Sequence, residues 1–139
     1  MAVKNKYVFD SCAVIGFLED EPFAGRIEEL LQKARNDDVQ LFLHAIQLGE
    51  VYYIALREQG QQMADMAYSR IKSFPLKYIE SISEELLLTS ATLKARFPIS
   101  YADSFAAGLA VTLDCPLLSG DLEFEKLENE GILEVAWLR

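Results

Sequence analysis

The sequence predicts one α/β domain, spanning residues 1–139, with a central parallel sheet of about five strands. Five short, mostly apolar or β-branched runs alternate with longer segments whose apolar residues recur at helical spacing. Strands that alternate with helices are joined by right-handed crossovers, which place helices on both faces of a parallel sheet. We therefore expect a three-layer α/β/α architecture.

The expected elements follow one another along the chain. Strands are expected at residues 7–9, 39–43, 76–79, 117–118 and 132–135. Helices are expected at residues 11–17, 24–35, 46–60, 61–74, 83–97, 100–113 and 121–129. The second helix is the clearest, because Ile27, Leu30, Leu31 and Ala34 form one apolar stripe. Gly60 divides a helical hairpin, and Pro98 separates two helices.

Composition excludes several classes of protein. The two cysteines and the single histidine, His44, are too few for a disulfide framework or a four-ligand zinc site, and they favour a reduced, cytoplasmic compartment. Asp10 interrupts the apolar N-terminal stretch, so a signal peptide is not expected. The longest uncharged apolar stretch, residues 104–113, is too short to span a membrane. The net charge of -9 argues at first against a nucleic-acid partner.

Four acidic residues are expected to meet at one edge of the sheet. Asp10 ends the first strand, and Asp121 follows the fourth strand. Glu50 and Asp103 lie early in helices whose N-terminal turns return to the same edge. Ligands of open parallel sheets bind outside the carboxyl ends of the strands, where the strand order reverses. This edge is therefore the candidate site.

Each acid also has a structural explanation. Ser100 and Asp103 form a helix-capping pattern, Asp121 could favour a helix N-terminus, and Glu50 could be a solvated helix residue. Asp10 is the hardest to explain in this way, because apolar residues surround it. Two carboxylates 4 Å apart repel by about 4 kcal/mol at an effective dielectric constant of 20. Either the four acids lie apart, or a cation lies among them, and hard oxygen ligands suit Mg²⁺ or Mn²⁺.

At these acids the sequence resembles a PIN domain, and within that superfamily the VapC-type toxins of toxin–antitoxin pairs. The matching segments are VFDS at 8–11, LGEVYY at 48–53, SYADSFAA at 100–107 and LSGDLEF at 118–124. They occur in the order typical of the family. The resemblance implies a metal-dependent endoribonuclease that hydrolyses RNA phosphodiester bonds, with a small antitoxin as partner and a homodimeric assembly.

The resemblance also implies roles for individual residues. Asp10, Glu50, Asp103 and Asp121 correspond to the acidic metal site, with Mg²⁺ or Mn²⁺ activating a water for phosphoryl transfer. Ser11 and Ser119 match hydroxyl residues that support this site, and Glu123 could share the ligand role of Asp121. Lys94 and Arg96, near the turn before the Asp103 helix, are candidate RNA phosphate contacts, although they could equally be solvated helix charges.

Two alternatives stay open. Gly120, Asp121 and Glu125 partly imitate a haloacid-dehalogenase-like phosphohydrolase, in which Asp10 would be a nucleophile, but the usual Gly-Thr does not follow Asp10. A non-catalytic binding module could use the same acids to hold its structure or to bind a basic partner. His44 is expected to be a core or edge residue rather than a catalytic one.

Overall fold

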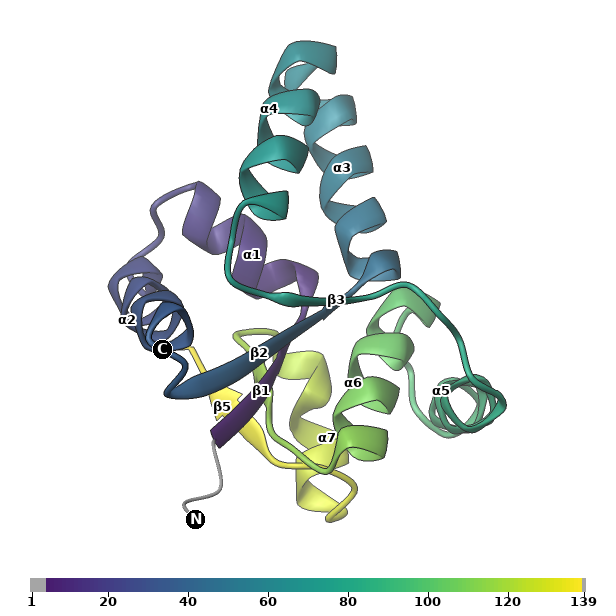
Figure 1. Ribbon diagram of the computed structural model, residues 1–139. Coiled ribbons are helices and arrows are strands. Elements are labelled where there is room, and N and C mark those ends of the chain that lie inside the picture. The colour runs from purple at the N-terminus through teal and green to yellow at the C-terminus, as the bar shows by residue number, and fades with distance from the viewer. Residues whose placement is uncertain (1–4, 139) are drawn as a thin grey trace.

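The computed structural model describes residues 5–138 and contains a five-stranded, all-parallel sheet between two layers of helices (Figure 1). The strands are β1 (Asn5–Phe9), β2 (Val39–His44), β3 (Lys77–Ile79), β4 (Leu117–Ser119) and β5 (Val135–Trp137). Their order across the sheet is β3-β2-β1-β4-β5. The winding reverses between β1 and β4, which pair in parallel. The three-layer α/β/α fold is confirmed.

The helices occupy the expected segments with small shifts at their ends. They are α1 (Ser11–Leu18), α2 (Ala24–Arg35), α3 (Ala45–Gln59), α4 (Gln61–Lys72), α5 (Glu84–Arg96), α6 (Tyr101–Leu113) and α7 (Glu125–Asn129). The segment 121–129 is not one helix, because a 3₁₀ turn at Leu122–Phe124 precedes α7.

The fifth strand lies later than predicted. Residues 132–135 were expected to form it, but the strand is Val135–Trp137. Gly131 has a φ of 74°, and the N–H groups of Gly131 and Ile132 donate to the carbonyls of Glu128 and Leu127. Residues 131 and 132 therefore close the end of α7, which is a common use of a glycine with positive φ.

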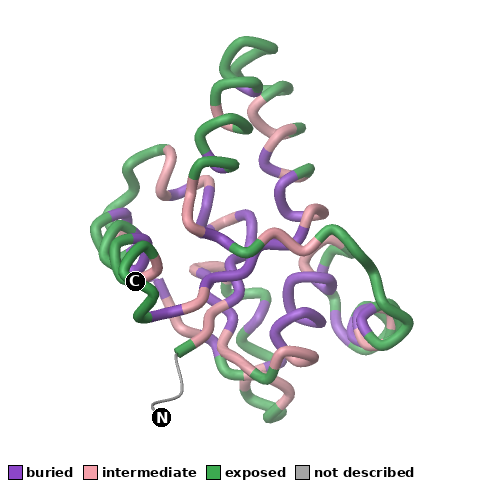
Figure 2. Tube along the Cα trace, viewed as in Figure 1, coloured by how far each residue is buried: buried purple, intermediate pink, exposed green. Residues whose placement is uncertain are grey.

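Alternating side chains of the strands form two separate hydrophobic cores. Val8, Phe42 and Leu117 face the layer that contains α5, α6 and α7. Phe9 and Leu118 face the layer that contains α1 and α2. Figure 2 shows the resulting buried strands at the centre of the molecule, with exposed residues on the outer sides of the helices. A sheet buried on both faces explains why its strands read as continuous apolar runs.

Two glycines allow specific helix arrangements. Gly60, with a φ of 89°, turns the chain from α3 into α4, and these helices form a hairpin that projects from the sheet (Figure 1). Gly108 on α6 lets α5 approach closely, since a Cβ atom there would lie 2.2 Å from the Ser90 hydroxyl oxygen. Among the described residues, no helix combines the length and apolar character needed to cross a bilayer.

Candidate functional site

The five acids singled out in the sequence, Glu123 included, lie around the carboxyl ends of β1 and β4. Asp10 directly follows β1, whose last residue, Phe9, is paired with Leu118 of β4. Asp121 and Glu123 follow β4, while Glu50 lies on α3 and Asp103 on the first turn of α6. The doubly wound topology thus brings residues more than 100 positions apart to the edge where the sheet reverses its winding.

Three of the acids form a compact group of oxygen atoms. Asp103, Asp121 and Glu123 each offer one carboxylate oxygen, and these atoms lie within 4.8 Å of one another. Burial, the charges of Glu50, Asp10 and Asp121, and a hydrogen bond with Glu123 together raise the pKa of Asp103 to about 7, and burial is the largest cause. Each of the other four acids of the site therefore contributes to the raised pKa of Asp103.

Asp10 is the most enclosed acid, with 1% of its surface exposed. One carboxylate oxygen accepts a 2.8 Å hydrogen bond from the Ala13 N–H and so caps α1, and the other accepts from the Ser119 hydroxyl. Burial raises the pKa of Asp10 to about 7 despite these two hydrogen bonds, and the charges of Asp121 and Glu50 add to the rise. Among residues 5–138, no cationic side chain pairs with the buried carboxyl group of Asp10.

Serine side chains connect the acids to the backbone. Ser11 donates its hydroxyl to Glu50, and Ser119, which donates to Asp10, also accepts a 3.0 Å hydrogen bond from the Asp121 N–H. Ser11 and Ser119 therefore contact two of the acids directly, and their role as supporting residues of the site stays a prediction.

Helix capping is also real at this site. Ser100 accepts from the Asp103 N–H at 3.0 Å, and Asp121 accepts from the Glu123 N–H at 2.9 Å. The capping explanation is therefore confirmed for both segments. It does not exclude the site explanation, because a cap at the start of a helix also fixes the side chains of its first turn.

Gln47 was not singled out in the sequence, although it links two parts of the site. Its side chain is fully buried, with the oxygen 3.2 Å from the Ser11 N–H and the nitrogen 2.6 Å from the Ala102 carbonyl oxygen. The available signal was a polar residue among apolar neighbours on α3, three positions before Glu50 and so on the same face of the helix.

Basic residues do not compensate the acids within residues 5–138. The ion pairs found there join Arg57 to Glu58 and Arg96 to Glu130. Lys94 donates instead to the Ile99 carbonyl oxygen at 2.7 Å. Lys94 and Arg96 are thus engaged away from the acids, and their role as phosphate contacts stays a prediction.

His44 and Cys12 lie outside the acidic group. His44 is buried and caps α3: its Nδ1 accepts from the Ile46 N–H at 3.1 Å, and its Nε2 donates to the Ser81 carbonyl oxygen at 3.1 Å. The expectation of a core histidine is confirmed. Burial, followed by the charge of Asp10, raises the pKa of the Cys12 thiol to about 11. The thiol is therefore protonated at neutral pH and is a poor metal ligand.

The donor set fits a hard divalent cation. It consists of carboxylate oxygens at one edge of the sheet, with two pKa values raised to about 7 and no basic residue of the described chain paired with them. Oxygen ligands of this kind suit Mg²⁺ or Mn²⁺ and disfavour a soft metal.

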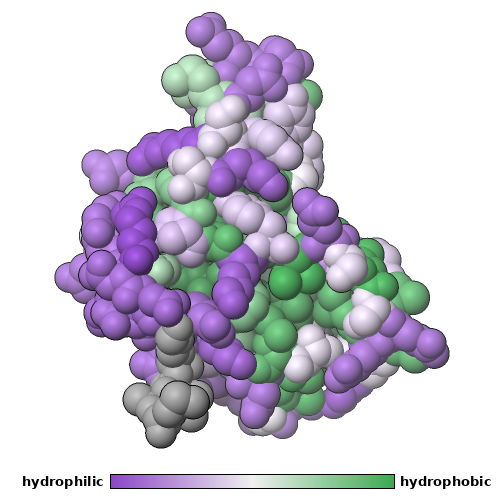
Figure 3. Space-filling model, in the orientation of Figure 1, coloured by the Kyte–Doolittle hydropathy of each residue, from purple (hydrophilic) through white to green (hydrophobic). Residues whose placement is uncertain are grey.

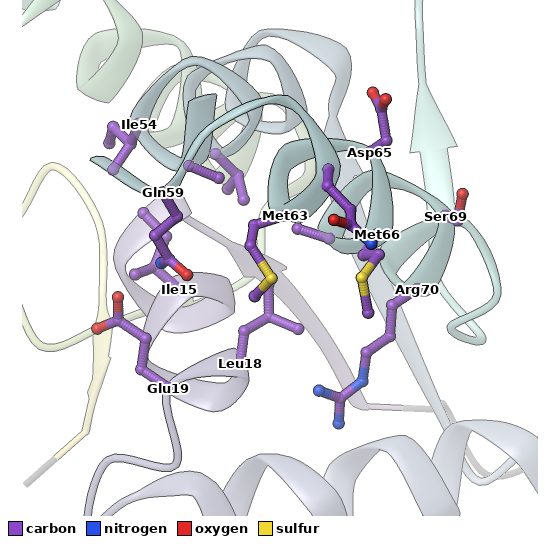
Figure 4. Close-up of a pocket in the computed structure, with 14 residues that line it drawn as sticks. Ile15, Leu18, Glu19, Ile54, Gln59, Met63, Asp65, Met66, Ser69 and Arg70 are labelled. Carbon is purple, nitrogen blue, oxygen red and sulfur yellow. The ribbon is translucent and has the colours of Figure 1, made fainter. Parts of the chain in front are cut away.

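A separate apolar groove lies between α1 and the α3–α4 hairpin. It has a volume of about 840 Å³, and none of the five clustered acids lines it. Figure 4 shows Ile15 and Leu18 of α1 on one side and Met63 and Met66 of α4 on the other. Glu19 and Arg70 also line the groove, which thus combines an apolar floor with charged groups.

The chain thus combines a parallel α/β/α fold with a group of carboxylates at the switch point of its sheet, and this combination defines its class. The chain belongs to the PIN domain family, whose match covers residues 7–130. A comparison with curated proteins found no match.

Several solved structures share the fold. A chain of VapBC2 from Rickettsia felis, bound to a DNA fragment from its promoter, has a TM-score of 0.75 and 15% identity, covering 96% of this chain and 99% of that one. DNA-bound VapBC from Salmonella typhimurium has a TM-score of 0.75 and 14% identity, covering 97% and 99%. VapC20 of Mycobacterium tuberculosis, described as a toxin that cleaves the sarcin–ricin loop, has a TM-score of 0.65 and 14% identity, covering 88% and 94%.

Proposed function

We propose that this PIN domain is a metal-dependent endoribonuclease that hydrolyses RNA phosphodiester bonds and acts as the cytoplasmic toxin of a toxin–antitoxin pair. The observation that supports this most is the group of carboxylates around Asp103, Asp121 and Glu123 at the carboxyl edge of the sheet, with which no basic residue of the described chain forms an ion pair. A similar fold in a toxin described as cleaving the sarcin–ricin loop is consistent with RNA as the substrate class.

In this proposal the acids divide into two groups. Asp103, Asp121 and Glu123 would bind the ion directly, with Asp10 and Glu50 completing the negative site from the sheet and from α3. A bound Mg²⁺ or Mn²⁺ supplies an activated water and offsets negative charge on the phosphate. Ser119 holds the carboxylate of Asp10, and Ser11 holds that of Glu50. These residues orient the site and need not touch RNA.

Burial of Asp10 argues against the phosphohydrolase alternative. A nucleophilic carboxylate must reach the phosphorus atom, but Asp10 is 1% exposed and both of its oxygens already accept hydrogen bonds. The binding-module alternative requires only that the acids hold structure. A carboxyl group whose pKa is raised to about 7 by burial destabilises the fold at neutral pH, so a purely structural role does not account for Asp10.

Cleavage of a mixed RNA pool tests the proposal. Wild type with Mn²⁺ is expected to cleave, whereas wild type with EDTA and the Asp103→Asn variant are expected not to. Asp38→Asn, which neutralises an exposed acid immediately before β2, is the matched control and should cleave like wild type. Equal cleavage by wild type and Asp103→Asn would refute the proposed site, and cleavage by none of the proteins on the RNA of their native host would favour a binding module.

The proposed antitoxin has a candidate docking place in the apolar groove. Met66 is 57% exposed there, and Leu18 faces it from α1, so an amphipathic helix would bury both. The charge of -9 favours a basic partner. Met66→Glu should weaken capture of a co-expressed antitoxin while leaving RNA cleavage intact. Unchanged capture would place the antitoxin elsewhere.

A homodimer is also proposed, and a second apolar surface supports it. Leu87 and Leu88 on α5 and the preceding Ile82 are exposed. Figure 3 shows hydrophobic residues gathered over the part of the molecule that contains α5 and α6, and hydrophilic residues over α2 and the tip of the hairpin. Light scattering should give a dimeric mass that Leu88→Glu reduces, and a monomeric wild type would contradict the proposal.

A further inference from the structure

The buried side chain of Gln47 joins α1, which directly follows Asp10, to α6, which carries Asp103. Gln47 lies on α3, and its exposed fraction is 0%. Its oxygen accepts from the N–H of Ser11, the residue after Asp10. Its nitrogen donates to the carbonyl of Ala102, the residue before Asp103. One side chain therefore connects the start of α1 with the first turn of α6.

Only an amide of this length satisfies both partners. The Ser11 N–H belongs to the first residue of α1 and has no acceptor within its own helix, so it needs an external acceptor. The Ala102 carbonyl needs a donor. A carboxylate in place of the amide would face this carbonyl with a second acceptor, and an apolar side chain would leave the Ser11 N–H buried without a partner.

The same linkage includes the second acid. Glu50 lies three residues after Gln47 on α3 and accepts the hydroxyl of Ser11, whose N–H is held by Gln47. We propose that Gln47 is a positioning residue that sets the spacing of Asp10, Glu50 and Asp103 and thereby the affinity of the site for a divalent cation. This inference rests on the proposed metal site, but not on the identity of the RNA.

His44, the last residue of β2 and the N-cap of the helix that carries Gln47, provides a matched control. Its side chain is 1% exposed and, like that of Gln47, joins a backbone N–H to a backbone carbonyl, those of Ile46 and Ser81. Neither of these partners adjoins an acid of the site. His44→Leu therefore removes a comparable pair of buried hydrogen bonds. If Mn²⁺ affinity depended only on the stability of the fold, His44→Leu and Gln47→Met should weaken it alike.

The test is the dissociation constant for Mn²⁺, measured by calorimetry on the full chain, together with urea unfolding in EDTA. Gln47→Met is expected to weaken Mn²⁺ binding about tenfold, as loss of supporting hydrogen bonds commonly does. His44→Leu should bind Mn²⁺ within about twofold of wild type, because its partners lie outside the site. Gln47→Asn keeps the amide but is too short to reach both partners, so it should weaken binding in the same direction and serves if the methionine variant does not fold.

Wild-type Mn²⁺ affinity in the folded Gln47 variants would overturn the inference, as would an equal loss in His44→Leu. RNA cleavage is recorded separately. A wild-type chain that binds Mn²⁺ but cleaves no RNA would refute the proposed ribonuclease activity, while the comparison of the Mn²⁺ dissociation constants would still decide the role of Gln47.

Discussion

Replacing Asp10 with asparagine should stabilise the metal-free protein at neutral and alkaline pH while abolishing its activity. Asparagine has nearly the same shape as aspartate and keeps an acceptor for the Ala13 N–H, but it carries no charge. Because Asp10 is 1% exposed and lies among other acids, its ionisation in the folded state is costly. The substitution removes that cost.

The size of the effect follows from the pKa of Asp10, which burial raises from 3.8 to about 7. At about 1.4 kcal/mol for each tenfold change in acid dissociation, this rise corresponds to about 4 kcal/mol. The folded state binds the proton more tightly than the unfolded state, so stability is lost as the pH rises from about 4 to about 7 and is then constant.

The hydrogen bond of Ser119 reduces the gain. The Ser119 hydroxyl donates to Asp10, and the amide nitrogen of an asparagine could not accept it, which costs about 1 kcal/mol. A net stabilisation of about 3 kcal/mol is expected at pH 8, and little or none at pH 4.5, where Asp10 is protonated in the folded protein. In a chain of this size that gain raises the melting temperature by roughly 10 °C.

Urea unfolding of both proteins in EDTA, at pH 4.5 and pH 8, measures the difference. Asp38→Asn, at an exposed position, is the control and should change stability little at either pH. Adding Mn²⁺ should reverse the order at pH 8, because only the wild-type site keeps its full charge. An Asp10→Asn variant that is no more stable than wild type at pH 8 in EDTA, or a difference that does not depend on pH, would refute the reasoning.

Three other predictions concern the site and the packing around it. Since burial raises the pKa values of Asp10 and Asp103 to about 7, Mn²⁺ affinity should increase from pH 5.5 to 7.5, and Mn²⁺ binding at pH 7 should release about one proton. Calorimetry in two buffers measures both, and an affinity that does not change with pH would contradict this. Gly108→Ala should lower the free energy of unfolding by about 2 kcal/mol, because the new Cβ would lie 2.2 Å from the Ser90 hydroxyl oxygen. Ser90→Ala should not lower the free energy of unfolding, since the buried Ser90 hydroxyl lacks a hydrogen-bond partner among the described residues. Glu128→Ala should lower the free energy of unfolding by about 2 kcal/mol, because the Glu128 carboxylate accepts from the Val135 N–H at 2.9 Å and from the Trp137 indole N–H at 3.0 Å. Glu130→Ala, at an exposed position, should lower it by less than about 1 kcal/mol in the same unfolding assay.

Most of the fold could be predicted because each local signal agreed with the others. The Ala24–Arg35 helix was expected from its apolar stripe, and β1 and β4 are neighbours, as a doubly wound order permits. The fifth strand could not be placed correctly, because apolar Ile132 and Leu133 look like strand residues. In the structure they pack against the core at the end of α7, and that depends on the backbone conformation of Gly131.

The acids of the site could be predicted because strand ends and helix starts have fixed places in a parallel sheet. Side-chain reach could not be predicted in the same way. Lys94 and Arg96 lie at the end of α5, as expected, but their long side chains bind the Ile99 carbonyl and Glu130. Gln47 was missed because a single glutamine in a helix is usually solvated, and only the tertiary structure shows that α1 and α6 close over it.

The placement of the acids also links metal binding to the choice of substrate. Five carboxylates at one edge create a negative potential that repels RNA, and no basic residue within 5–138 forms an ion pair with them. A bound divalent cation would offset part of this negative charge and would offer a phosphate oxygen a direct ligand contact, since it would be the largest single charge in the site. With a net charge of -9 the rest of the surface contributes little to nonspecific affinity. RNA binding should therefore depend on metal occupancy and on the shape of the RNA, more than on a general attraction to phosphates.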